Sequence, residues 1–274
     1  MGKLGAYMEL LDLPPVVLVL VAAAGFTTFA AGGESPSGLA AFLLSILLTQ
    51  FAIALHNHYC DRYLDSVAHP RRALPRGLLP PRLVVAAAWG LFVLGLGVAL
   101  AVGPWVSGLL ALGTGAAFVY NAWLKRTVWS WLPYWVALPT LVVCSFAVAR
   151  RGDANLWTAY VIGLPLVLAI HLVDELSDVD ADRAAGVRGL AHRLGARRSR
   201  YAAWAALAAA QGLALWLWPA GRTPGPLFYL SLGLLLAAYA LGTGGVRRGH
   251  WLAAMGSALA LALAWVGDLA AVWR

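Results

Sequence analysis

Charged residues are scarce in this sequence. They make up 12% of its 274 residues, whereas soluble globular domains carry about 25%. Hydrophobic residues account for 61%, and the mean hydropathy is +0.76. This composition excludes an ordinary soluble protein and predicts an integral membrane protein. The apolar segments leave no room for a separate soluble domain.

Cysteine is almost absent as well. The two cysteines, Cys60 and Cys144, lie in or beside apolar segments far apart in the sequence. This excludes a framework of disulfides and argues against a cysteine-held metal. We expect both to be small buried apolar residues.

The positive charge is uneven in its distribution. The formal net charge is +8, and the basic residues fall in short loops between apolar segments. A nucleic-acid partner is therefore not expected, and no feature of the sequence implies a protein partner.

Nine apolar segments approach the length of about 20 residues that an α-helix needs to cross a bilayer. Residues 1–13 precede them and predict a short interfacial helix. Glycine and proline mark the turns between segments. We therefore predict an all-α, multi-pass protein with transmembrane helices at 14–32, 38–60, 82–102, 105–124, 129–149, 156–176, 200–218, 226–243 and 251–272.

The arginines and lysines define an orientation. Nine spans put the two termini on opposite sides, and 16 of the 20 basic residues fall on the N-terminal side. Because basic residues collect on the cytoplasmic side, the N-terminus and the loops near 61–82, 125–126 and 183–200 are predicted to be cytoplasmic. The richness in Ala, Arg, Gly and Leu suggests a bacterial source, and hence a bacterial cell membrane.

The end of the second segment carries a first acidic motif. Asn57, Asp61 and Asp65 are spaced at i, i+4 and i+8, which places them on one helix face over roughly 12 Å. Arginines follow at once, among them Arg71 and Arg72. Oxygen ligands suit Mg²⁺ and arginines suit phosphate, so this pattern predicts a metal-and-phosphate site.

The sixth segment repeats the pattern. Asp174, Asp178 and Asp182 have the same spacing and again precede arginines. Glu175 and Asp180 lie off that face and are expected to be solvated or to adjust the local charge. Residues 38–82 and 156–200 therefore form a predicted pseudo-repeat that brings both motifs to one cavity.

Both motifs resemble those of a known family. The run Asn57-x-x-x-Asp61-x-x-x-Asp65, with the following residues 72–77, resembles the first motif of the UbiA superfamily of intramembrane prenyltransferases, and residues 174–195 are similar to the second. The resemblance covers nearly the whole chain. It implies one domain, residues 1–274, with nine transmembrane helices around a central cavity and cytoplasmic cap loops after helices 2 and 6.

The resemblance also implies an activity. Family members bind a prenyl diphosphate through Mg²⁺ and transfer the prenyl group to an acceptor, here expected to be small and aromatic. Asn57, Asp61, Asp178 and Lys125 are the expected catalytic residues. The metal ligands implied are Asn57, Asp61, Asp65, Asp174, Asp178 and Asp182, and the diphosphate contacts are Tyr120, Lys125, Arg71, Arg72 and Arg188. Of Arg71 and Arg72, one is expected to reach phosphate and the other to stay in solvent.

Two departures and two alternatives accompany this prediction. Leu13 stands before the proline that opens the first span, where many members have a basic residue, which argues against an aromatic carboxylate as acceptor. Gly189 replaces the usual threonine of the second motif.

Two alternative functions remain open. An intramembrane terpene cyclase would need the same metals. A cation transporter fits less well, because the acids lie at helix ends beside arginines rather than at the bilayer centre. His171, one turn before Asp174, is expected to form hydrogen bonds, and the alternative is that it supports a metal ligand or deprotonates the acceptor.

Overall fold

The structure is a computed structural model that describes residues 3–31, 36–151, 154–184, 189–218 and 221–272. Every regular element within these ranges is a helix. The α-helices are α1 (Lys3–Leu10), α2 (Leu13–Ala30), α3 (Leu39–Ala68), α4 (Pro81–Leu100), α5 (Pro104–Ala122), α6 (Leu132–Val148), α7 (Thr158–Ala184), α8 (Leu190–Leu194), α9 (Ala196–Trp216), α10 (Pro226–Thr243) and α11 (Arg247–Val272), with 3-10 turns at Leu124–Arg126 and Ala154–Trp157.

A long helix coincides with each of the nine predicted segments, and the predicted interfacial helix is α1. Six of these helices in the described part of the chain, α2, α3, α4, α7, α10 and α11, are long and apolar enough to cross a membrane. A further one, α6, is apolar but has only 17 residues. The protein is therefore an all-helical, multi-pass integral membrane protein.

Proline sets the start of several of these helices. Pro14, Pro81, Pro104 and Pro226 each occupy the first turn of a helix. At that position the missing N–H has no partner within the helix, and the fixed φ angle suits helical backbone. The chain can thus turn sharply and enter the next apolar helix at once.

Helices α3 and α7 are longer than a bilayer requires. The 30 residues of α3 span about 45 Å at 1.5 Å per residue, against about 30 Å for the hydrocarbon core. The 27 residues of α7 span about 40 Å. Each helix therefore carries an acidic motif on turns that continue beyond its apolar part.

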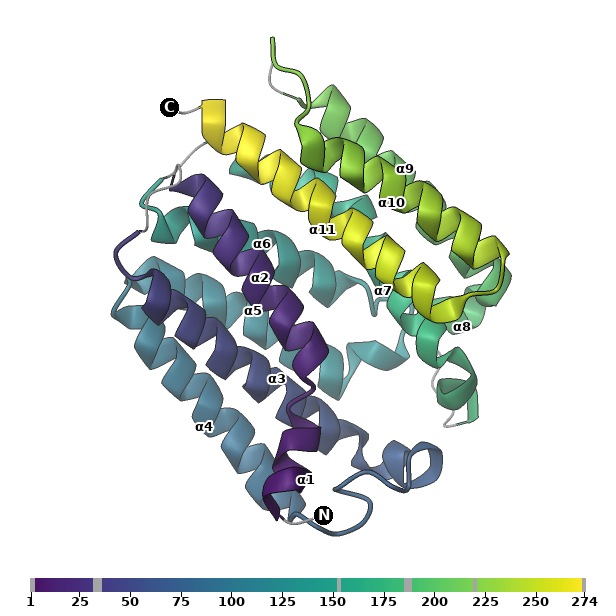
Figure 1. The fold of residues 1–274 in the computed structure, drawn as a ribbon. Coiled ribbons are helices and arrows are strands. Elements are labelled where there is room, and N and C mark those ends of the chain that lie inside the picture. Colours follow the sequence, from purple (N-terminus) through teal and green to yellow (C-terminus); the bar gives the residue numbers. More distant parts are fainter. Residues whose placement is uncertain (1–2, 32–35, 152–153, 185–188, 219–220, 273–274) are drawn as a thin grey trace.

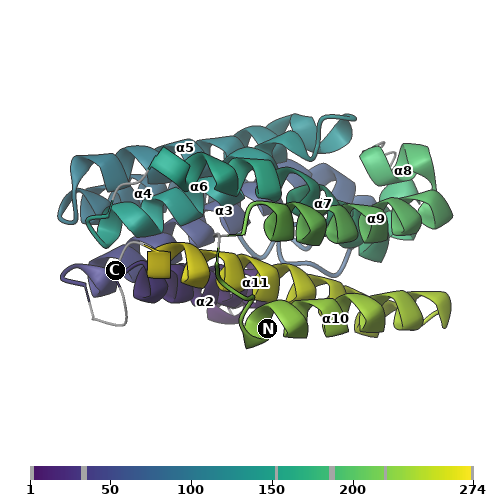
Figure 2. The same cartoon turned by 90° about the horizontal axis from the view of Figure 1, so that it is seen from above.

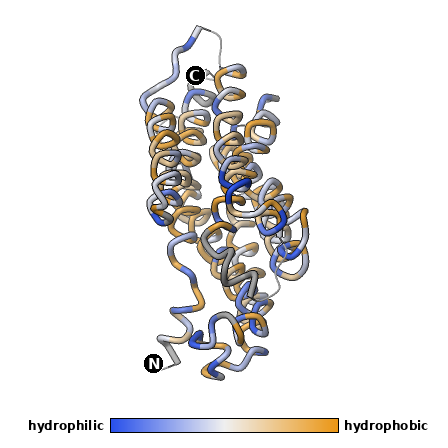
Figure 3. The backbone as a smooth tube through the Cα atoms, turned by 90° about the vertical axis from the view of Figure 1, so that its right-hand side faces the viewer, coloured by the Kyte–Doolittle hydropathy of each residue, from blue (hydrophilic) through white to orange (hydrophobic). Residues whose placement is uncertain are grey.

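The long helices surround a shared core. Figures 1 and 2 show α2, α10 and α11 together on one face, with α3 to α7 and α9 behind them. Figure 3 shows hydrophobic residues along the helices, while most strongly hydrophilic residues lie at helix ends and in loops. A second, smaller core forms where α1 packs on residues 73–79 and on the ends of α3 and α4. There the backbone N–H of Ala73 donates to Glu9 Oε1 over 3.2 Å.

Close packing of α3 against α4 depends on Gly95. A Cβ atom at this position would lie 2.8 Å from Thr49 Cγ2 and 3.2 Å from the Ser45 carbonyl oxygen. Small residues of this kind let membrane helices approach closely. We expect Gly95→Leu to lower the free energy of unfolding by about 1–3 kcal/mol through overpacking. Gly97→Leu is the matched control, since a Cβ there meets no atom within 4 Å. Thermal unfolding in detergent measures both, and equal stability of the two variants would contradict the tight interface.

Candidate active site

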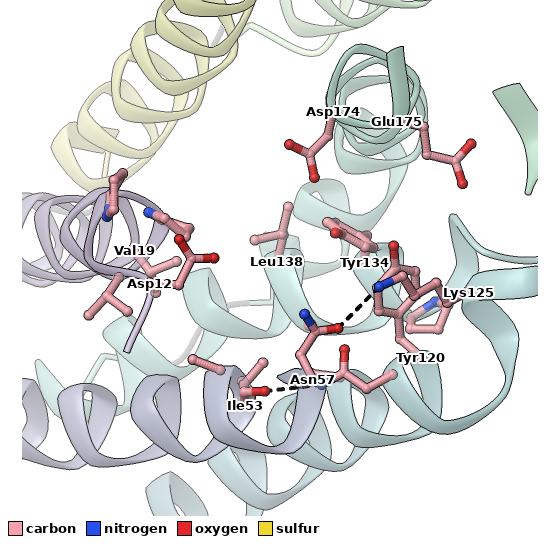
Figure 4. A pocket seen from close by; sticks show the side chains of 18 of the residues that line it. Asp12, Val19, Ile53, Asn57, Tyr120, Lys125, Tyr134, Leu138, Asp174 and Glu175 are labelled. Atoms are coloured by element: carbon pink, nitrogen blue, oxygen red, sulfur yellow. Dashed lines mark hydrogen bonds between the residues drawn. The ribbon is translucent and has the colours of Figure 1, made fainter. Parts of the chain in front are cut away.

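One cavity of about 1170 Å³ lies at the centre of the helices. Its walls come from α2, α3, α5, α6, α7, α9 and α11, and both Asp61 of the first motif and Asp174 of the second line it. Figure 4 shows Asn57 on α3 and Asp174 on α7 on opposite sides of this space. The structure therefore brings two segments more than 100 residues apart in the sequence to the same cavity.

The first motif lies on the cavity-facing side of α3, as its spacing predicted. Asn57, Asp61 and Asp65 all line the cavity. The ammonium group of Lys125, from the turn after α5, donates to Asp61 Oδ2 and, over 3.3 Å, to Asn57 Oδ1. The other Asp61 oxygen, Oδ1, is buried and has no hydrogen-bond partner among the described residues. Asp61 thus keeps one carboxylate oxygen available to a ligand.

The end of the motif is held by a second cation. Arg72 Nη1 donates to Asp65 Oδ1 over 2.8 Å, and His58 Nδ1 lies 3.9 Å from Asp65 Oδ2. Arg72 lines the cavity, whereas Arg71 is exposed and does not. Arg72 therefore lies beside the acidic motif and Arg71 lies toward solvent, while the contact of Arg72 with phosphate stays a prediction.

The opposite wall presents Asp174 with two tyrosines. Trp251 Nε1 of α11 donates to Asp174 Oδ1 over 3.3 Å, and the Tyr134 hydroxyl interacts with both Tyr120 and Asp174. The Tyr120 and Tyr134 rings pack edge to face with centroids 5.1 Å apart. Tyr120 lines the cavity near Lys125, where a diphosphate contact was expected (Figure 4). The side chains of Asp178 and Asp182, and all of Arg188, lie outside the described residues.

Glu175 is buried, and of the two roles expected for it this excludes the solvated one. Its Oε2 accepts the backbone N–H of Ala191 over 2.7 Å, and its Oε1 accepts from Ser130 Oγ over 3.3 Å. His171 Nε2 lies 3.2 Å from the same Oε1 and 2.7 Å from Ser130 Oγ. Figure 4 shows the Glu175 carboxylate pointing away from that of Asp174. Glu175 therefore joins α7 to the start of α8 and to the turn before α6, and the hydrogen-bonding role expected of His171 is confirmed.

Gly189 leaves room for this carboxylate. A Cβ atom on Gly189 would lie 2.3 Å from Glu175 Oε1. We expect Gly189→Ala to displace Glu175 and to lower the free energy of unfolding by about 1–3 kcal/mol, the cost of a lost buried hydrogen bond to a charged group. The clash is tested by a double-mutant cycle with Glu175→Ala, read by thermal unfolding. In the Glu175→Ala background the glycine substitution should cost little further; an undiminished cost would place its cause elsewhere.

The residues at the first motif fit a magnesium ion. The donors Asn57 Oδ1 and Asp61 Oδ1 are oxygens on one helix face, and the second is buried without a partner. Mg²⁺ prefers oxygen ligands and keeps part of its shell for water and substrate phosphate. Among the described residues, no three acidic, histidine or cysteine side chains converge on one metal position. The arrangement that fits Mg²⁺ here is one or two carboxylates from each wall together with phosphate oxygens.

Several residues that line the cavity or contact its acidic side chains were not identified from the sequence. Tyr134 and Trp251 contact Asp174, and Ser130 binds Glu175. Arg200 and Arg248 line the cavity, although in the sequence they carry only a topology signal. Nothing in the local sequence distinguishes these residues from other interfacial aromatic and basic residues.

The fold and this cavity define a class, a polytopic membrane protein with acidic and basic side chains gathered at one intramembrane chamber. The chain belongs to the UbiA prenyltransferase family, whose sequence model matches residues 17–250. It is therefore a membrane enzyme of the prenyltransferase class, as the two motifs predicted.

Curated relatives are similar over most of their length. A digeranylgeranylglyceryl phosphate synthase of Methanoregula boonei is 29% identical over 221 residues, which is 76% of this chain and 76% of that protein. Protoheme IX farnesyltransferase 1 of Paramagnetospirillum magneticum is 32% identical over 217 residues, or 74% and 72% of the two chains.

Solved structures share the fold. A UbiA homologue from Archaeoglobus fulgidus bound to GPP and Mg²⁺ superposes with a TM-score of 0.72 at 16% identity, covering 97% of this chain and 99% of that one. The same homologue bound to DMAPP and Mg²⁺ has a TM-score of 0.71 at 17% identity over the same shares.

Proposed function

We propose that this chain transfers a prenyl group from a prenyl diphosphate to a small, aromatic acceptor, with Mg²⁺ as cofactor. The observation that carries the proposal is the single cavity shared by Asp61, Lys125 and Asp174. Carboxylates and a lysine at one end of a largely apolar chamber suit a molecule with an anionic head and a hydrocarbon tail. Relatives solved with Mg²⁺ and the prenyl diphosphates GPP and DMAPP support the same assignment.

Each wall of the cavity has a proposed part in holding the diphosphate. Lys125, Arg72 and Tyr120 would bind its oxygens. Mg²⁺, when bound, would neutralise the diphosphate and make it a better leaving group. We retain Arg188 as a diphosphate contact from the sequence prediction, and we assign Arg71, which is exposed and does not line the cavity, to solvent. The proposed metal ligands are Asn57, Asp61, Asp65, Asp174, Asp178 and Asp182.

The apolar part of the cavity would hold the prenyl tail. Val16, Val19, Ile46, Leu110 and Leu141 line it, from α2, α3, α5 and α6. These side chains exclude water from the tail and from the allylic carbon. In the proposed reaction, the bond between that carbon and the diphosphate oxygen breaks, and its electron pair leaves with the diphosphate. The acceptor then bonds to the carbon and loses a proton.

The membrane arrangement is part of the proposal. We propose that all nine long helices cross the membrane, with the N-terminus, the acidic motifs and cap loops after the second and sixth of them in the cytoplasm. The excess of basic residues on that side supports this orientation. We also keep the single domain of residues 1–274, the pseudo-repeat of 38–82 and 156–200, and the bacterial cell membrane as proposals.

A product analysis tests the activity. The purified full chain would be incubated with Mg²⁺ and geranyl diphosphate, with and without phenolic, quinol and sugar-phosphate acceptors, and the products read by mass spectrometry. We expect a prenylated acceptor and released diphosphate. A cyclic hydrocarbon or alcohol formed without acceptor would instead identify a terpene cyclase, and the absence of any product from the diphosphate would overturn the proposal.

A further inference from the structure

A second group of basic side chains lies on the cavity wall away from the first motif. Arg200 at the start of α9, and Arg248 and His250 at the start of α11, all line the cavity. We call these three residues the basic corner. They come from helices that carry neither acidic motif.

Two members of the basic corner converge on Gly242 at the end of α10. Arg200 Nη1 donates to the Gly242 carbonyl oxygen over 2.7 Å. A Cβ atom on Gly242 would lie 2.9 Å from His250 Cδ2 and 3.3 Å from Arg200 Cδ. The single Gly242 bond uses only one of the five N–H donors of the guanidinium. Arg200 therefore has donors to spare for a ligand in the cavity.

His250 is oriented as a donor. Its Nε2 accepts the indole N–H of Trp204 over 3.2 Å, which places the ring proton of a neutral histidine on Nδ1. The residue is only 6% exposed. Within the described part of the chain, no hydrogen-bond partner exists for Nδ1, and this atom is not among the fully enclosed ones. A buried N–H group that faces open space calls for an acceptor.

No carboxylate among the described side chains compensates the charges of the basic corner. Lys125 and Arg72, on the other wall, each form an ion pair with an aspartate. Neither Arg200 nor Arg248 lies within ion-pairing distance of a described carboxylate. Arg248 also stands in the first turn of the 26-residue helix α11, where the helix dipole adds partial positive charge. Donors without acceptors on a cavity wall define an anion site.

The basic corner comes from α9 and α11, whereas the first acidic motif lies on α3 and the second on α7. Trp251, which touches Asp174, lies one helical turn from Arg248 on the same face of α11. The corner thus adjoins Asp174 of the second acidic motif and lines the same cavity as Asp61 and Lys125, from helices other than α3. A molecule held there can reach the allylic carbon of a donor held between the motifs.

We propose that the basic corner binds a phosphate group of the prenyl acceptor. This inference rests on the proposed function. Donor and acceptor then each have their own anion site in one cavity, and the acceptor is a charged molecule rather than a neutral phenol. Arg200, Arg248 and His250 fix its orientation toward the donor.

The test compares a charged and a neutral compound that share a 4-hydroxyphenyl group. Binding of 4-hydroxyphenyl phosphate and of hydroquinone to the purified full chain in detergent would be measured by calorimetry, without donor, for the wild type, Arg248→Ala and Arg198→Ala. Arg198 is the matched control, because it is exposed on α9 and does not line the cavity. We expect Arg248→Ala to weaken phosphate binding about tenfold and to leave hydroquinone and geranyl diphosphate binding unchanged, whereas Arg198→Ala should match the wild type.

Four results would overturn the proposal. Equal affinity of the wild type for the two compounds would show that the basic corner is not an anion site. An equal loss of geranyl diphosphate affinity in Arg248→Ala would assign the corner to the donor. Loss of the phosphate preference in micelles containing phosphatidylglycerol would assign it to a lipid headgroup. If the wild type binds the phosphate through Arg248 but prenylates no acceptor, the anion site exists but is not an acceptor site. Only this last result would also count against the proposed function.

Discussion

Asp61→Asn is expected to lower the rate of prenyl transfer by about 1000-fold, which corresponds to roughly 4 kcal/mol of transition-state stabilisation. Asp61 is buried, lines the cavity and keeps one carboxylate oxygen without a protein partner. Asparagine preserves the shape of the side chain and can still accept the bond from Lys125. It removes the negative charge and with it a strong metal ligand. The rate with geranyl diphosphate, measured at saturating Mg²⁺, reads this loss directly.

Two companion measurements make this result specific. Ser66→Ala changes an exposed residue of the same helix and should retain the wild-type rate. Thermal unfolding should show Asp61→Asn folded, because Lys125 keeps a hydrogen-bond acceptor. A folded Asp61→Asn protein with normal turnover would contradict the assigned role. By the sequence pattern, Asp178→Asn should cause a loss of similar size.

Removal of divalent metal is expected to stop the reaction, with a loss of at least about 1000-fold. The cavity is lined by five acidic side chains, Asp12, Asp61, Asp65, Asp174 and Glu175, and by four cationic ones, Arg72, Lys125, Arg200 and Arg248, of which Arg72 and Lys125 are already paired. A diphosphate would add further negative charge to this balance. Without a divalent cation the site would repel the diphosphate it has to bind.

The experiment is a chelation and add-back series. Turnover would be measured after treatment with EDTA and again after excess Mg²⁺ is supplied, with tryptophan fluorescence as a check that the protein stays folded. Recovery on addition of Mg²⁺ is the expected result. Turnover that persists in EDTA would show that the cavity compensates the negative charge of the diphosphate without a divalent metal.

The first acidic motif and the helices could be predicted because their signals are local. A run of apolar residues defines a membrane helix wherever the rest of the chain lies, and a spacing of four defines a helix face. Asn57, Asp61 and Asp65 accordingly line one cavity. The same reasoning is weaker for α9, which begins with several arginines and is rich in alanine, so that it falls outside the six strongly apolar helices.

The role of Glu175 could not be predicted in this way. Its position off the Asp174 face was correct, but its burial depends on Ser130 and the N–H of Ala191, from segments 45 and 16 residues away. Such contacts follow from how helices pack, and a single sequence does not encode them in any local period. Arg200 and Arg248 were recognised only as cytoplasmic charges for the same reason, since their common cavity appears only after α9 and α11 are packed together.

The most direct test is a structure of the full chain with Mg²⁺ and geranyl S-thiolodiphosphate, a donor analogue that resists ionisation. The account predicts that the diphosphate lies between α3 and α7, with metal ions bound by Asp61 and Asp65 on one side and by aspartates of α7 on the other. A diphosphate held by one motif alone, or bound outside the space between these two helices, would contradict it.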